Sequence, residues 1–455
     1  MKRHQQSMLE GPLFSSIIRY TIPIILTSIL QLLFNAADLV IVGRFRGSLS
    51  VAAVSATSAL VNLIVNLFIG LSVGAGVTVA HALGSREDVV VHKAVHTAIP
   101  LSLVGGVIVT LVGVFFSEDF LVLMGTPENV LPLSALYLKI YFGGIIFTMV
   151  YNFCAAILRA AGDTKSPLIF LATAGVLNVG LNVLFVSSFH MNVEGVAIAT
   201  VVSQAVSAVL VMIALMRRTD ACKLQLHKIG FYKPQLLKMM RVGLPAGIQS
   251  SMFSISNVII QSSINSFGDV LMSGNGAAAS IEGFIYVANN AFHQTAVNYI
   301  GQNAGAGQYK RVKKIYTICL FSSMIVTMLL SSAAYLFGPE LLSIYITDSA
   351  KAIEYGMIRF TYVALPYFLC ALMDVTTGAL RGLGASFTPM LVSVLGVCGI
   401  RLAWIYTIFQ IPAYHSPESL YLSYPISWTI TFLFHLFFFI RIYKKHINAW
   451  NLAHK

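Results

Sequence analysis

Long apolar runs separated by short polar segments form the dominant pattern of this chain. About 20 apolar residues are enough for an α-helix to cross the ~30 Å hydrocarbon core of a bilayer. Runs of this kind lie at 14–42, 53–83, 94–116, 133–158, 166–189, 194–216, 236–264, 277–301, 314–337, 356–380, 388–410 and 421–442. The pattern predicts an all-α polytopic membrane protein with twelve transmembrane helices, because only helices satisfy every backbone polar group within such runs.

The two halves of the chain repeat one another. The clearest matches, each 222 positions apart, are Arg19 with Arg241, Pro23 with Pro245, Asn35 with Asn257 and Pro167 with Pro389. Six helices in each half give both halves the same orientation, which predicts two six-helix bundles related by a pseudo-two-fold axis along the membrane normal. We therefore expect an N-terminal bundle at 1–216, a cytoplasmic linker at 217–235 and a C-terminal bundle at 236–455.

Composition and charge narrow the class of protein further. The chain is 57% hydrophobic and only 10% charged, which excludes a soluble protein with a polar shell. Most of the 29 Lys and Arg residues fall in the segments that would lie inside, so we expect both termini in the cytoplasm. The net charge of +12 thus reflects topology, and no basic stretch has the signature of nucleic-acid binding.

The five cysteines show no disulfide or metal-binding spacing. We expect no cofactor and no resident metal. The expected setting is the inner (plasma) membrane of a bacterium, where the protein contacts lipids, binds no nucleic acid and works as a monomer.

One carboxylate, Asp38, lies inside the first apolar run. A charged side chain near the bilayer centre costs about 2.5–3.5 kcal/mol on insertion scales, so such residues usually handle ions, protons or substrate. Asn178 and Asn182 share a face of the fifth predicted helix, and Thr200 lies on the sixth. Together the four residues would offer carboxylate, amide and hydroxyl oxygens to a small cation or a proton. The competing interpretation of each asparagine is an interhelical hydrogen bond.

The second half carries its own polar side chains. A stripe at steps of 4, 3 and 4 residues on the eighth predicted helix consists of Glu282, Tyr286, Asn289 and His293. With Asp374 on the tenth helix, these residues are predicted to bind substrate. Glu282 or Asp374 would otherwise be a buried partner of Arg401, and His293 a satisfied interior histidine. Arg359 is placed on the outer side of the membrane.

Pro23 lies inside the first predicted helix, fifteen residues before Asp38. Proline removes a backbone hydrogen bond and kinks a helix. We predict a hinge there that couples protonation of the acid to bending, with a static kink as the competing interpretation.

Several motifs together resemble the multidrug and toxic compound extrusion (MATE) transporters, and in particular multidrug members from Gram-positive bacteria. They are AADLVIVGRF around Asp38, LRAAGDTKSP, NVGLNVLFV, VEGVAIAT and YPISW. The resemblance implies a V-shaped antiporter that exports organic, often cationic drugs in exchange for H⁺ or Na⁺.

The same resemblance maps the family's cation site onto Asp38, Asn178, Asn182 and Thr200, and its bending first helix onto Pro23. Glu282 looks like the eighth-helix acid of the Gram-positive multidrug members. Some relatives have an acid where this chain has Asn182, so Asp38 would be the only carboxylate of that site.

Three other functions are competing interpretations of the same residues. A lipid-linked oligosaccharide flippase of the same superfamily would favour a more cationic cavity, whereas Arg401 is the single deep cation predicted here. An intramembrane enzyme would need more than His293 beside Glu282, although the two residue types also occur in zinc sites of the HxxxE type. A channel fits poorly with the two-fold repeat, which is typical of halves that rock past each other.

Overall fold

The computed structural model describes residues 8–347 and 349–453, and every regular element in them is helical. The first half comprises α1 (Leu13–Arg46), α2 (Ser48–Gly84), α3 (Asp88–Leu123), α4 (Leu131–Gly143), α5 (Ile145–Ala160), α6 (Lys165–Asn182), the π-helical turn η1 (Val183–Ser188) and α7 (Val193–Met216). A short 3₁₀ turn, η2 (Leu226–Lys228), lies in the linker that follows.

The second half has the same order of long helices with more interruptions. It comprises α8 (Lys233–Asn265), α9 (Asp269–Gly305), α10 (Tyr309–Leu336), α11 (Gly338–Ser343), α12 (Ala350–Arg359), η3 (Phe360–Ala364), α13 (Tyr367–Gly382), α14 (Phe387–Ser393), η4 (Val394–Gly399), α15 (Ile400–Tyr406), η5 (Ile408–Gln410), η6 (Pro412–Tyr414) and α16 (Pro417–Ala453). Of these short turns, η3 and η4 are π-helical, and η5 and η6 are 3₁₀.

Each of the twelve predicted apolar runs coincides with one helix or with one bent helical rod. Eight rods in the described residues are long and apolar enough to span a membrane, and two bent pairs bring the number to ten. The pairs are α4 with α5, bent by 47°, and α12–η3 with α13, bent by 42°. The two remaining long helices, α8 and α9, are the more polar ones. The predicted all-α multi-pass class is confirmed.

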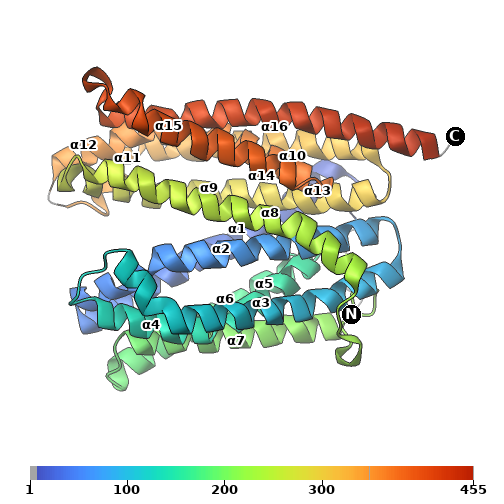
Figure 1. Cartoon of the computed structure of the whole chain (residues 1–455), viewed down its shortest axis with the longest axis horizontal. Coiled ribbons are helices and arrows are strands. Elements are labelled where there is room, and N and C mark those ends of the chain that lie inside the picture. The colour runs from blue at the N-terminus through green and yellow to red at the C-terminus, as the bar shows by residue number, and fades with distance from the viewer. Residues whose placement is uncertain (1–7, 348, 454–455) are drawn as a thin grey trace. The chain divides into compact units, whose positions relative to one another are not determined.

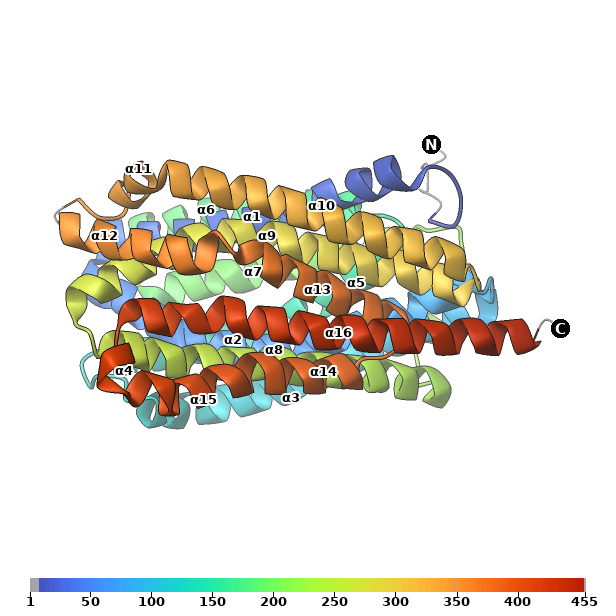
Figure 2. The ribbon, with the colours of Figure 1, turned by 90° about the horizontal axis from the view of Figure 1, so that it is seen from above.

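The helices form two compact units. Unit 1 contains Ile22–Gly247, and unit 2 contains Met8–Thr21 together with the chain from Ile248 onward. Within unit 1, helices α2, α3, α5 and α7 run side by side (Figure 1), and within unit 2 helices α9, α10, α13 and α16 do so (Figure 2). Both α1 and α8 are therefore divided between units, although each is continuous.

The division of α1 and α8 falls next to their internal prolines. In α1, the residues before Pro23 pack in unit 2: the Tyr20 ring meets the Tyr299 ring edge-on at 5.2 Å, and the Thr21 and Thr295 hydroxyls are 2.9 Å apart. In α8, the unit changes after Gly247, two residues beyond Pro245. Proline removes one backbone hydrogen bond from a helix. Each helix therefore changes unit close to the place where its backbone hydrogen bonding is interrupted.

The first part of α8 packs against α2 through glycines. Gly70 and Gly74 on α2 face Gly243 and Gly247 on α8, so that a Cβ atom on Gly74 would lie 2.7 Å from the Gly243 nitrogen. Both pairs have the small-xxx-small spacing that lets helix backbones approach closely in membranes. This contact was not predicted, although both G-x-x-x-G motifs are readable in the sequence.

The linker after α7 is fixed to unit 1. The backbone N–H of Gln225 donates to His96 Nε2 at 2.9 Å, and that of Tyr232 donates to the Thr97 hydroxyl at 3.2 Å, which ties residues 225–232 to α3. Burial, reinforced by the charge of Asp220, raises the pKa of the Cys222 thiol to about 12. Cys222 therefore stays a thiol at neutral pH.

We predict that Gly70→Ala destabilises unit 1. The new methyl group would overlap the backbone of α8 around Gly247, and overpacking of this kind costs about 1–3 kcal/mol. Thermal unfolding of the purified protein in detergent measures the effect. Gly180→Ala on α6 is the matched control, because its methyl group would meet no described heavy atom within 4 Å. Equal melting temperatures for the two variants would contradict the close approach of α2 and α8.

Candidate functional site

The four residues of the predicted cation site meet in unit 1. Asp38 on α1 is 9% exposed, and the Asn182 amide donates to its Oδ1 at 2.5 Å. The same amide nitrogen lies 3.2 Å from Asn178 Oδ1, and Asn178 Nδ2 donates to the Thr200 hydroxyl at 3.4 Å. A continuous chain of hydrogen bonds therefore links α1, α6 and α7.

Local helix geometry explains why these side chains converge. Asn178 and Asn182 lie one turn apart on α6, and Asn182 is its last residue before the π-helical turn η1. A π turn rotates the residues that follow it relative to a regular helix, and such turns are frequent at functional sites. On α7, the Thr200 hydroxyl donates to the Val196 carbonyl, which fixes the direction of its lone pairs.

Asp38 has only neutral hydrogen-bond partners. The ion pairs found among the described residues are Lys139–Glu118, Arg218–Asp220 and Arg359–Glu282, so none involves Asp38. Asn182 Oδ1 is buried and accepts no hydrogen bond from the residues that the structure describes. A buried carboxylate without a cation is costly, and an oxygen-lined site that also holds an unsatisfied amide oxygen suits a small hard cation or a proton.

The polar stripe of α9 does not form one site in unit 2. Glu282 faces Arg359 on α12, Asn289 accepts a hydrogen bond from Thr327 on α10, and His293 faces α13. Tyr286, in contrast, is 46% exposed. The spacing of 4, 3 and 4 residues places these side chains along one side of the helix, but three different helices pack against that side.

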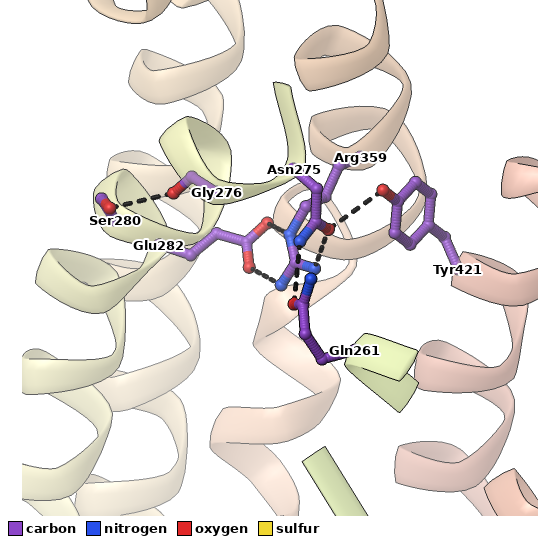
Figure 3. Close-up of polar contacts among 7 residues, drawn as sticks. All are labelled: Gln261, Asn275, Gly276, Ser280, Glu282, Arg359 and Tyr421. Carbon is purple, nitrogen blue, oxygen red and sulfur yellow. Dashed lines mark hydrogen bonds and ion pairs between the residues drawn. The ribbon is translucent and has the colours of Figure 1, made fainter. Parts of the chain in front are cut away.

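Glu282 forms a two-pronged ion pair with Arg359. Arg359 Nε and Nη2 donate to the two carboxylate oxygens at 3.0 and 2.6 Å (Figure 3). Arg359 Nη1 also donates to Asn275 Oδ1 at 2.7 Å, and the Tyr421 hydroxyl donates to the same oxygen at 3.0 Å. Both charged side chains are buried, at 4% and 7% exposure.

This ion pair excludes one competing interpretation. The partner of Glu282 is Arg359 and not Arg401, and Arg359 is buried in unit 2. The position of Arg359 inside the predicted run 356–380 was the available signal for its burial. The pairing itself could not be read from the sequence, because 77 residues separate the two partners.

Asp374 lies in a separate polar cluster around Arg381. The Cys370 thiol donates to its Oδ2 at 3.7 Å, and no ion pair to it is found within the described residues, so the suggested pairing with Arg401 is not formed. Arg381 is buried: Nη2 donates to Gln249 Oε1 at 2.8 Å, and Nη1 donates to His293 Nε2 at 3.3 Å.

His293 has partners for both ring nitrogens. Nε2 accepts from Arg381, so Nδ1 carries the proton and donates to the Asp374 carbonyl oxygen at 2.7 Å. The ring is therefore held as a neutral tautomer. Among the described residues, no three His, Cys, Asp or Glu side chains are grouped as a metal site would require.

Comparison with known proteins identifies the family. The MatE family profile matches residues 23–184 and 245–407. The chain belongs to the MatE family. The two matched segments begin at Pro23 and Pro245, the prolines at which α1 and α8 change unit, so the family repeat and the division of the two helices share a starting point.

Relatives of this MatE protein include proteins named for multidrug resistance or multidrug export. It is 28% identical over 400 residues to the probable multidrug resistance protein YpnP of Bacillus subtilis, covering 86% of this chain and 87% of the relative. It is 22% identical over 392 residues to the multidrug export protein MepA of Staphylococcus saprophyticus, covering 86% and 84%.

Solved structures share the fold of the MatE chain. A crystal structure of a MATE protein in the bent conformation has a TM-score of 0.91 at 18% identity, covering 99% of this chain and 100% of the other. A multidrug resistance MATE family transporter of the MOP superfamily, solved in an outward-facing conformation, has a TM-score of 0.90 at 20% identity, covering 98% and 100%. The predicted MATE-like twelve-helix fold is confirmed.

We predict that Glu282→Gln lowers the thermal stability of the protein. It would leave the Arg359 guanidinium buried without a carboxylate, and breaking a buried ion pair on one side costs about 3–5 kcal/mol. The double variant Glu282→Gln/Arg359→Met should recover most of the loss, as measured by thermal unfolding in detergent. A single variant as stable as wild type would show that the pair is not formed.

Proposed function

We propose that the protein is a secondary active multidrug efflux antiporter, which exports organic, often cationic compounds in exchange for H⁺ or Na⁺. The relatives named as multidrug proteins support the choice of substrate. The proposed setting is the plasma membrane of a bacterium, with both termini in the cytoplasm and the monomer as the working form. No cofactor is required, because the ion gradient supplies the free energy.

The observation that carries the proposal is the neutral surrounding of Asp38. A carboxylate locked to Lys or Arg could not exchange its counter-ion, whereas Asp38 accepts a hydrogen bond from the Asn182 amide and forms no ion pair among the described residues. Binding of H⁺ or Na⁺ would remove its net charge. A ligand shifts a conformational equilibrium only by its difference in affinity for the two states, so the cation would bind Asp38 more tightly in one state than in the other.

Replacing Asp38 should uncouple transport from the gradient. We expect Asp38→Asn to abolish gradient-driven dye efflux from liposomes, because an amide cannot take up a proton or neutralise a cation. Efflux is measured under separately imposed H⁺ and Na⁺ gradients, which also identifies the coupling ion.

Glu118→Gln is the matched control for Asp38→Asn. Its side chain is 59% exposed and pairs with Lys139, so its loss should leave efflux near the wild-type rate. Wild-type efflux by Asp38→Asn would refute the role of the acid. Dye flux that needs no gradient and does not saturate would instead indicate a channel.

Pro23 is the proposed hinge at which α1 bends when an ion binds to Asp38. The residues of α1 before Pro23 pack in unit 2, and those that follow, including Asp38, belong to unit 1. If the part of α1 after Thr21 changes direction, the helix must bend near Pro23, where one backbone hydrogen bond is missing.

We expect Pro23→Ala to slow exchange while dye binding is kept. Alanine would restore an amide N–H and with it the missing backbone hydrogen bond, which removes a defect of about 3 kcal/mol, so a loss of about ten-fold or more in rate is expected. Pro425→Ala is the matched control, because Pro425 lies within α16 and away from any change of unit. Equal exchange rates for the two variants would contradict the hinge.

A further inference from the structure

The start of α10 and the end of α16 meet at one end of unit 2. The Tyr443 hydroxyl on α16 donates to the Tyr309 carbonyl oxygen at 3.0 Å, and the rings of Tyr309 and His446 are 5.9 Å apart. Two turns further along α10, the ring centres of Tyr316 and Phe439 are 4.2 Å apart. Figure 2 shows α16 continuing past the turn that joins α9 to α10. The two helix ends therefore form one continuous surface.

This surface is strongly cationic. No Asp or Glu occurs in residues 283–339 or 419–455, which contain both helix ends. We call the exposed cations there the basic end of unit 2, and they are Lys310, Lys313, Lys314, Arg441, Lys444 and Lys445. None of them forms an ion pair within the described residues.

The segment before α1 adds little negative charge to the basic end. Arg311 Nη2 donates to the Glu10 carbonyl oxygen at 3.1 Å, and Nη1 donates to that of Gly11 at 3.2 Å. This segment therefore approaches α10 through neutral carbonyl groups and brings one carboxylate, that of Glu10. The first turn of α10 contains no acid, although a helix N-terminus favours negative charge. The basic end thus keeps a large excess of positive charge.

On α10, exposed apolar side chains lead directly to the cations. Ile325 and Phe321 are each 52% exposed. Lys314 and Lys310 follow them toward the helix start at steps of seven and four residues, which keeps all four side chains on one side of the helix. In a multi-pass membrane protein, an exposed apolar side faces the lipid tails. The lysines lie where that side leaves the apolar run predicted at 314–337.

The exposed side of α16 changes from apolar to cationic in the same way. Phe437 is 57% exposed and lies four residues before Arg441, and Ile440 is 46% exposed and lies four residues before Lys444. The apolar run predicted for this helix ends at 442. Trp450, which is 41% exposed, lies further along α16, and tryptophan is enriched where a membrane meets water. Both helices therefore place their cations at the level of the lipid headgroups.

We propose that the basic end of unit 2 binds an anionic phospholipid. Its phosphate group contacts the cations of α10 and α16, and its acyl chains lie along the exposed sides that carry Phe321 and Phe437. Anionic headgroups attract clustered Lys and Arg residues beside membrane-spanning helices. A soluble phosphate compound would use the cations but not the apolar sides, whereas a phospholipid uses both. The site is separate from Asp38 and does not depend on the exported compound.

Two phospholipids with identical acyl chains test the proposal. Phosphatidylglycerol is anionic, and phosphatidylcholine carries a compensating positive charge. Native mass spectrometry of the purified full-length protein in detergent micelles gives the affinity for each lipid. Wild type should bind phosphatidylglycerol at least ten-fold more tightly. Lys314→Gln/Lys444→Gln should weaken binding of phosphatidylglycerol about ten-fold and change that of phosphatidylcholine by less than about two-fold.

Two further variants separate the site from the total charge of the protein. Lys314→Arg/Lys444→Arg keeps both positive charges and should retain the affinity of wild type. Arg44→Gln/Lys351→Gln removes two exposed cations from other positions, the end of α1 and the start of α12, and should also retain it. All the substituted side chains are exposed, so melting temperatures close to that of wild type are expected for each variant.

A competition experiment distinguishes a lipid site from a phosphate site. Glycerophosphoglycerol has the headgroup of phosphatidylglycerol without acyl chains, and millimolar concentrations should displace little of the bound lipid. Efficient displacement would overturn the proposal, because the site would then recognise a soluble phosphate. Equal affinities of wild type for the two lipids would also overturn it. So would an affinity for phosphatidylglycerol that is unchanged in Lys314→Gln/Lys444→Gln, or lowered equally in Arg44→Gln/Lys351→Gln.

Discussion

The free-energy cost of removing a charge from water constrains the arrangement of polar side chains in this protein. Each buried charge must have a partner, and the kind of partner indicates the role. Glu282 and Arg359 neutralise one another and join α9 to α12. Asp38 has a neutral amide partner, and Arg401 has aromatic rings. These two charges are incompletely compensated.

Asp38 and Arg401 lie on helices with interrupted backbone hydrogen bonding. Asp38 follows Pro23 on α1, its partner Asn182 precedes the π turn η1, and Arg401 follows the π turn η4. Interruptions of this kind aim side chains that a regular helix would place elsewhere, and they leave backbone groups free to rearrange. At these positions, therefore, polar side chains and helix irregularity coincide.

The sequence predicted the helices well because hydropathy and helix length are local properties. It also predicted the Asp38 cluster, since Asn178 and Asn182 share a helix face and Thr200 adds a hydroxyl from the next predicted helix. It did not predict which helices the polar side chains of α9 contact. Helical spacing specifies the side of the helix on which they lie but not the neighbours that pack against that side. The Glu282–Arg359 pair depends on contacts between distant segments, and the distinction between Arg359 and Arg401 as partner of the acid needed coordinates.

The two repeats share a scaffold but differ in chemistry. In the repeat, the position of Asp38 corresponds to Ile260, which is buried in the apolar cluster that also contains Tyr424 and Trp428. Unit 2 therefore has no acid where unit 1 has its cation site, and the uncompensated charge in that cluster is the positive one of Arg401.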